Sequence, residues 1–218
     1  MRYPLVLLMT IFLIGCNQQD SKKQEDKSVG QIKDSLVTNP ELKKDSAALA
    51  SNDSLLLQLS KNILATIKTK DLSKMSSYVH PGLGIRFSPY AFVDTIHQQH
   101  LLPQQLTTFN QQKKVLVWGS HDGSGEPIKL SIHKYFDEFV YDADFINAPH
   151  QAVNKVLASG NSLNNLKVIY PNADFTEFYF PGFDPKYDGM DWKTLRLVFQ
   201  TENNKAWLIA IIHDEWTI

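Results

Sequence analysis

Three consecutive polar residues, His213, Asp214 and Glu215, follow an apolar run in the last part of the sequence. A histidine beside a carboxylate is suited to general-base catalysis, because its pKa lies close to neutral pH. His213 and Asp214 are therefore candidate catalytic residues for a small pocket enzyme, such as a hydrolase, a lyase or an isomerase. The alternative interpretation is that the three residues mark the point at which a buried strand reaches water.

The segment 120–127, with the sequence SHDGSGEP, has the composition of a ligand-binding loop. Its alternating glycines let the backbone turn sharply and approach a ligand. The carboxylates of Asp122 and Glu126 are candidate ligand-binding groups, because they can accept hydrogen bonds or bind a cation. The loop lacks the acidic ladder of an EF-hand and the lysine of a P-loop. A plain connection between two strands is the alternative interpretation.

Arg86 and Tyr90 lie near a predicted bend of the chain and are further candidates for ligand binding. A guanidinium can hold a carboxylate or a phosphate through two parallel hydrogen bonds. The alternative for Arg86 is an ion pair with a structural acid such as Asp94. The two interpretations differ in whether the positive charge is available to a ligand.

The motifs predict neither a metal site nor a cofactor. The sequence has no HExxH motif, and its single cysteine excludes both a CxxC zinc cluster and an internal disulfide. The seven histidines are scattered, and only His97 and His100 lie within four positions of each other. The GxSxG motif of serine hydrolases is absent as well.

Three helices are expected to help position these residues. Apolar residues at helical spacing predict a first helix that starts at an Asp53 N-cap, and a short second helix that starts at Asp71. The second helix should end before Pro81, because the residue before a proline avoids helical geometry. A third helix is predicted from Ile132 to Val140, capped by Ser131, because its apolar residues form one stripe.

The clearest predicted element is a long hairpin, whose strands run from Thr194 to Gln200 and from Ala206 to Asp214. Both alternating sets of side chains in its second strand are apolar, which predicts a strand covered on both faces. Further extended segments are predicted at Ile85–Phe87, Tyr90–Val93, Val115–Trp118, Leu166–Tyr170 and Phe175–Phe180. The expected fold class is α+β, with N-terminal helices packed on a bent, mixed or antiparallel sheet that ends in the hairpin.

Composition and charge narrow the class of protein. The chain has 218 residues, of which 43% are hydrophobic, and its formal net charge is −1. This balance argues against a broad basic face, so no nucleic-acid partner is expected. Nearly all aromatic residues lie within residues 53–218, a segment long enough to bury one sizeable core without disulfides.

The first sixteen residues, MRYPLVLLMTIFLIGC, have the features of a secretory signal, because a cation precedes an apolar run too short to span a bilayer. The ending LIGC resembles the lipobox of bacterial lipoproteins. This resemblance implies that residues 1–15 are removed and that fatty acyl chains on Cys16 anchor the protein to a membrane surface. An ordinary signal peptide is the alternative. Residues 16–52 have mixed charge and no aromatic residue, which predicts a flexible tether before a single globular domain at 53–218. A solvated amphipathic helix around Glu41–Ala50 is the alternative for part of this segment.

The order of the predicted elements, closed by the hairpin TLRLVFQTENNKAWLIAIIHDEW, resembles the NTF2-like α+β cone. The strings YVHPGLGIRFSPY, WGSHDGSGEPIKL, NAPHQAVNKVLASGN, FPGFDPKYDGMDW and IIHDEWTI resemble an uncharacterised group of bacterial envelope lipoproteins. This group implies a location in the cell envelope and no particular activity, and the cone hosts many functions. Asn17 stands where an aspartate would resemble an inner-membrane retention signal, which favours the outer membrane.

We therefore expect a lipid-anchored protein on the extracytoplasmic side, whose domain binds a small ligand or another envelope protein without catalysis. Two alternatives stay open: a pocket enzyme with His213 or Asp214 as base, and a structural or immunity-type protein that acts through its surface. The surface alternative centres on Phe180–Trp192, which combines aromatic residues, turn formers and three aspartates. A cavity with a few convergent polar groups would favour binding, and an exposed aromatic patch without a cavity would favour surface contact.

Replacing the single cysteine tests the anchor. Cys16→Ser removes the acyl acceptor, so we expect the variant to move from the membrane fraction to the soluble fraction, because the acyl chains carry the membrane affinity. Fractionation and immunoblotting of the wild type and the variant measure this change. An unchanged distribution between the two fractions contradicts acylation at Cys16.

Overall fold

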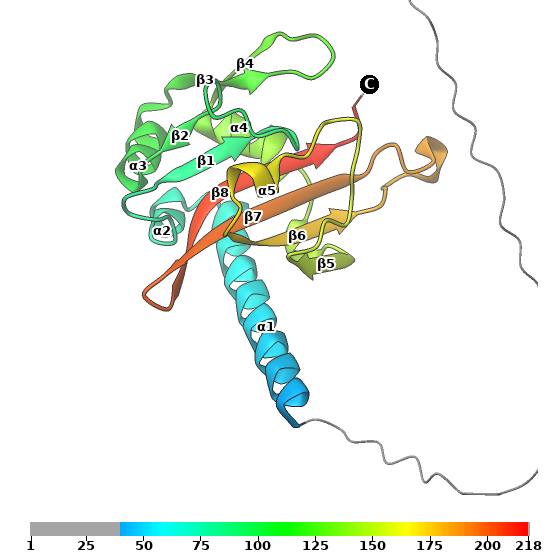
Figure 1. Cartoon of the computed structure of the whole chain (residues 1–218). Coiled ribbons are helices and arrows are strands. Elements are labelled where there is room, and N and C mark those ends of the chain that lie inside the picture. The colour runs from blue at the N-terminus through cyan, green and yellow to red at the C-terminus, as the bar shows by residue number, and fades with distance from the viewer. Residues whose placement is uncertain (1–39, 218) are drawn as a thin grey trace, which may run out of the picture. The chain divides into compact units, whose positions relative to one another are not determined.

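Helix α1 (Pro40–Lys68) leads into the folded part of the chain (Figure 1). The computed structural model describes residues 40–217, with side chains from residue 51 onward, so the expected signal peptide, Cys16 and the first part of the expected tether lie outside the described residues. Asp53 lies within α1, and the expected N-cap at this position is therefore wrong. The reason is that a proline starts the helix at its first position and neither glycine nor proline follows before Asp53.

Two predicted helix starts are confirmed. Helix α2 (Leu72–Ser76) begins after Asp71, whose carboxylate accepts a hydrogen bond from the backbone N–H of Lys74 at 2.9 Å. Helix α4 (Ile132–Phe139) begins after Ser131 and buries its predicted apolar stripe. The other helical segments are α3 (Pro103–Gln112), α5 (Leu166–Ile169) and the short 3-10 turns η1 (Phe145–Asn147) and η2 (Pro185–Tyr187). Within the described residues, none of the helices has both the length and the apolar composition that crossing a bilayer requires.

The central element is a mixed sheet of six strands in the order β2-β1-β8-β7-β6-β5 (Figure 1). Its strands are β1 (Ile85–Ser88), β2 (His100–Leu101), β5 (His150–Val153), β6 (Asp174–Phe180), β7 (Lys193–Glu202) and β8 (Lys205–Glu215). Strand β1 runs parallel to β8, and the other neighbours are antiparallel. A separate two-stranded sheet joins β3 (Val115–Ser120) to β4 (Pro127–Ser131). The structure therefore confirms an α+β fold with a mixed sheet that ends in the predicted β7–β8 hairpin.

Strand β8 is covered on both faces, as its sequence predicts. On one face, Leu208 and Ile211 belong to the main core together with the apolar faces of α1, α2 and α4. On the other face, Ala210 and Ile212 belong to a smaller core that includes Leu166 of α5. Figure 1 shows α4 and α5 on opposite sides of this strand.

Two expected strands are wrong. Leu166–Tyr170 forms α5, because the Asn164 side chain accepts the backbone N–H of Leu166 at 3.0 Å and a helical turn buries Leu166 while Val168 stays exposed. Tyr90–Val93 is an irregular turn, because the Ser88 hydroxyl donates to the carbonyl oxygens of Tyr90 and Phe92 and folds the segment back. In both places a local polar side chain overrides the apolar pattern.

Truncating the core aromatic Phe87 tests the main core. Phe87 is fully buried, and its ring lies 5.5 Å from that of Trp118 and 5.6 Å from that of Phe136, centroid to centroid. We expect Phe87→Ala to lower the free energy of unfolding in urea by about 3–5 kcal/mol. The control Phe183→Ala changes a half-exposed ring and should cost less than about 1 kcal/mol. Equal losses in the two variants would contradict the assignment of this core.

Candidate functional site

The two candidate catalytic residues lie inside the protein. His213 is 0% exposed and Asp214 is 1% exposed, so β8 does not reach water at these positions. Because consecutive residues of a strand point to opposite faces, the two side chains enter different cores. Each therefore has its own set of partners.

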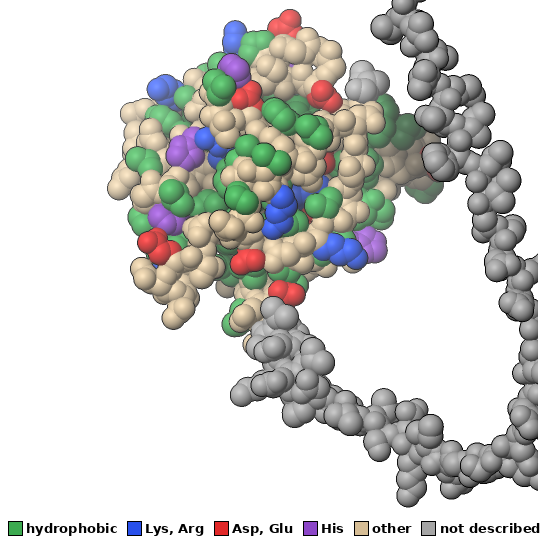
Figure 2. Space-filling view, viewed as in Figure 1, with side chains coloured by type: hydrophobic (Ala, Val, Ile, Leu, Met, Phe, Trp, Pro, Cys, Tyr) green, Lys and Arg blue, Asp and Glu red, His purple; other side chains and the backbone are tan. Residues whose placement is uncertain are grey.

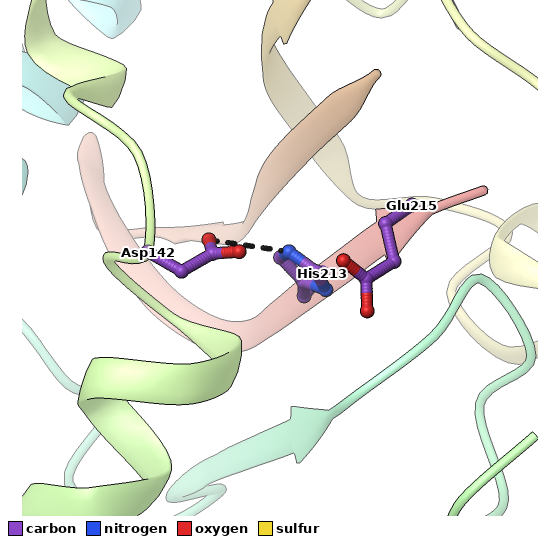
Figure 3. Close-up of side chains that lie close together, drawn as sticks. All are labelled: Asp142, His213 and Glu215. Atoms are coloured by element: carbon purple, nitrogen blue, oxygen red, sulfur yellow. Dashed lines mark ion pairs between the residues drawn. The ribbon is translucent and has the colours of Figure 1, made fainter. Parts of the chain in front are cut away.

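His213 faces the main core, where both ring nitrogens are directed at oxygen atoms. Its Nδ1 donates to the carbonyl oxygen of Pro89 at 3.1 Å, and its Nε2 lies 3.3 Å from the carboxylate of Asp142 (Figure 3). Asp142 comes from the loop after α4, and the rings of Phe139 and Phe145 stand edge-on to the imidazole. The sequence did not point to Asp142, because it lies far from His213 along the chain.

His213 and Asp142 form a cluster of ionisable side chains together with Lys193 and Glu215. Burial disfavours an imidazolium, but the Asp142 carboxylate outweighs burial and raises the pKa of His213. Burial also disfavours the charged form of Asp142, yet His213 and Lys193 lower the pKa of that carboxyl. Lys193 forms an ion pair with Asp142 and another with Glu215 at 3.2 Å. Nε2 of His213 is buried against the Asp142 carboxylate, where no substrate proton can reach it, so the general-base role lacks support from this geometry.

Asp214, on the opposite face, lies beside a buried ion pair. Arg196 is 0% exposed and holds Glu177 through two hydrogen bonds, from Nε at 3.0 Å and from Nη2 at 3.2 Å. Its Nη1 lies 3.4 Å from Asp214, so two carboxylates share one guanidinium. Burial raises the pKa of Asp214 to about 6, although Arg196 and His213 oppose the rise. One signal in the sequence marks this pair: Glu177 and Arg196 are charged residues in strands rich in large apolar side chains.

Arg86 lines a cavity of about 410 Å³ over the outer face of β1 and β8. Its Nη1 donates to the carbonyl oxygens of Asp94, Thr95 and Gln98 at 3.5, 3.3 and 3.3 Å. The Asp94 carboxylate instead lies 2.6 Å from Nδ1 of His97. The expected alternative, an ion pair between Arg86 and the Asp94 side chain, is therefore wrong. Among the described residues, no carboxylate lies within ion-pair distance of Arg86.

The remaining ligand-binding candidates do not join Arg86. Tyr90 and Asp122 line a separate cavity of about 270 Å³, where burial raises the pKa of Tyr90 against the effect of the Asp122 backbone N–H. Glu126 is exposed in the turn between β3 and β4, outside both cavities. A backbone hydrogen bond of 2.8 Å from His121 to Glu126 closes this turn, which matches a plain connection between two strands.

The segment Phe180–Trp192 is a structured loop with an apolar outer side. The Asp191 carboxylate accepts the backbone N–H groups of Phe183 and Asp184 at 3.0 and 2.8 Å, which holds the loop closed. Phe183 and Met190 are about half exposed. The loop is thus packed by its own hydrogen bonds, and its outer apolar side chains are partly available for contact.

Comparisons with known proteins return no match to a protein-family model, a curated protein or a solved structure. The function is therefore argued from the geometry of the site. Figure 2 shows basic and acidic side chains scattered over the face that it displays, with hydrophobic side chains between them. Because no single sign of charge dominates that face, the local environment of individual charges decides what each can bind.

Neutralising Asp214 tests the charge arrangement around Arg196. Because the folded-state pKa of about 6 lies above the ordinary 3.8, this carboxyl contributes stability that is complete below pH 3.8 and lost as the pH rises through 6. At about 1.4 kcal/mol per pKa unit, the loss is on the order of 2–3 kcal/mol. We expect Asp214→Asn to remove this part of the pH dependence, measured as the free energy of unfolding from pH 3.5 to 7.5.

The matched control is Asp188→Asn, which changes an exposed carboxylate in a turn. Its pH profile should follow that of the wild type. A profile of Asp214→Asn that also follows the wild type would contradict a buried, proton-binding Asp214.

Proposed function

We propose that this protein is a lipid-anchored binding module of the bacterial cell envelope, and that it binds a small anionic ligand at Arg86. One observation carries this function: a half-buried guanidinium faces a cavity, and its hydrogen bonds go to backbone carbonyls. A cation in such a position keeps its charge for a ligand. Its chemistry is that of a carboxylate or phosphate site.

The walls of this cavity specify the rest of the ligand. Its volume of about 410 Å³ lies in the range of small-molecule sites. Leu83 and Ile209 give it an apolar side, while Tyr170 and Gln200 bring a hydroxyl and an amide. We therefore infer a ligand with one anionic group and an apolar body. The three carbonyls that hold Arg86 Nη1 fix the guanidinium before the ligand arrives, which lowers the entropic cost of binding.

The place of the module follows from its leader sequence. Acyl chains on Cys16 would keep the domain at the extracytoplasmic surface of a membrane, with the outer membrane favoured by Asn17. The membrane is thus the first partner, and the small ligand or another envelope component is the second. A likeness to the NTF2-like cone and to envelope lipoproteins belongs to the same proposal.

Binding is favoured over catalysis because of where the candidate bases lie. His213 and Asp214 line neither the Arg86 cavity nor the cavity at Tyr90, and both are buried. A general base must come within hydrogen-bond distance of the proton that it removes. A substrate in either cavity would not meet these two residues.

A series of carboxylates from acetate to octanoate, each paired with its neutral primary amide, tests the site. We expect carboxylates with longer apolar tails to raise the melting temperature of the full-length protein in detergent, because a ligand that binds the native state stabilises it by mass action. The amides should have a smaller effect. Arg86→Gln should remove the difference between the two series, since it keeps hydrogen-bonding capacity and loses the charge.

The matched control is Lys129→Gln, which removes a cation from an exposed position on β4, outside this cavity. It should respond to the carboxylates as the wild type does. The proposal fails if no carboxylate stabilises the wild type more than it stabilises Arg86→Gln.

A further inference from the structure

The cluster at the end of β8 contains two buried polar atoms that lack a hydrogen bond. Nε2 of His213 and Oδ1 of Asp142 lie 3.3 Å apart, and neither makes a hydrogen bond with a described residue. The His213 side chain is 0% exposed and that of Asp142 is 8% exposed. Polar atoms buried to this degree are normally satisfied, so this pair needs an explanation.

The second nitrogen of the ring decides what the explanation can be. Nδ1 of His213 donates its proton to the Pro89 carbonyl at 3.1 Å, which leaves Nε2 as the position of the lone pair in the neutral ring. A lone pair directed at a carboxylate oxygen 3.3 Å away is repulsive unless a proton or a metal ion lies between them. An imidazole that donates one N–H to a backbone carbonyl is also the usual arrangement of a metal-binding histidine.

Glu215 completes a set of three ligands. It lies two positions after His213 on the same face of β8, and Figure 3 shows it projecting from that strand beside the imidazole. One ligand atom from each of Asp142, His213 and Glu215 lies within 4.8 Å of the other two. A buried nitrogen without a hydrogen-bond partner thus faces the Asp142 carboxylate, and Glu215 lies near enough to supply the third ligand.

We propose that Asp142, His213 and Glu215 bind a divalent transition-metal ion, for which Zn²⁺ is the best fit. Two ligands on a tetrahedral ion with bonds of about 2.0–2.1 Å are separated by about 3.3–3.4 Å, close to the distance between Nε2 and Oδ1. One imidazole and two carboxylates suit zinc better than calcium, which prefers oxygen ligands alone. Water is the natural fourth ligand of such a site.

Lys193 sets the charge of this site without taking the ligand atoms of His213 and Asp142. Its Nζ pairs with Oδ2 of Asp142 and with Oε2 of Glu215, which leaves Oδ1 of Asp142 to the ion. Two carboxylates against one ammonium leave a net negative charge beside a neutral imidazole, and this charge attracts a cation.

The ion would join two parts of the fold and has a route of entry. Glu215 and Lys193 have side chains 29% and 25% exposed, so solvent reaches the cluster from the end of the strand. A bound ion would tie the loop after α4 to the last strand of the sheet. Because such a site exists only in the folded state, the binding energy adds to the stability of the fold.

Zinc binding to the full-length protein in detergent tests the site, with a purification tag that contains no histidine. Metal-free protein is titrated with Zn²⁺ against a chromophoric chelator, and we expect saturable binding of one ion per chain. Glu215→Gln, a near-isosteric change at a partly exposed position, should weaken the affinity at least tenfold. The matched control is Glu202→Gln at the other end of the same hairpin, which removes the carboxylate that lies 3.0 Å from His80 and should leave the affinity unchanged.

X-ray absorption at the zinc edge of the loaded wild type gives an answer that does not depend on any variant. We expect scattering from one imidazole and from oxygen ligands, and no sulfur. Absence of saturable binding, equal affinities of the wild type and Glu215→Gln, or a sulfur ligand would each overturn the site. The cluster would then be an ion pair that binds only a proton. None of these outcomes bears on the Arg86 cavity.

Discussion

Burial of β8 on both faces is the constraint on which the rest of the structure depends. Since neighbouring side chains of a strand alternate between faces, His213 must enter the main core and Asp214 the smaller one. A buried polar or charged group without a partner is unfavourable, so each core has to supply one. Asp142 does so on the first face and Arg196, already paired with Glu177, on the second. These contacts hold the end of the sheet to the elements that cover it.

The same electrostatic rule separates the structural charges from the one that is open to a ligand. On β8 and its neighbours, buried charges are held by other residues of the chain. Arg86 differs, because backbone carbonyls position its guanidinium and leave its charge without an acidic partner among the described residues. The half-buried position matters as well: a fully exposed arginine would be screened by water, and a fully buried one could not meet a ligand. The proposed ligand would therefore meet a residue that the sheet orients and whose charge no acidic side chain among the described residues neutralises.

Elements with a periodic pattern could be predicted from the sequence, and those decided by a single side chain could not. The two alternating sets of apolar side chains in β8 and the apolar stripe of α4 follow directly from the spacing of apolar residues in the sequence. The helix at Leu166 depends on one hydrogen bond, from the backbone N–H of Leu166 to the Asn164 side chain, which the apolar pattern does not indicate. For the sites, His213 and Asp214 stand out because they interrupt an apolar strand, whereas their partners come from other elements. Likewise, Arg86 has no acidic partner among the described residues because the Asp94 carboxylate pairs with His97, and this pairing depends on the fold.

The central claim is that the cation in the cavity, and not the buried charges of β8, meets the ligand. Nuclear magnetic resonance mapping on the isotope-labelled, full-length protein tests it most directly, by titration with the carboxylate that stabilises the protein most. The account predicts that the backbone amide shifts concentrate at Arg86, Tyr170 and Gln200, which line the cavity. Shifts centred on His213 and Asp214 instead would contradict it.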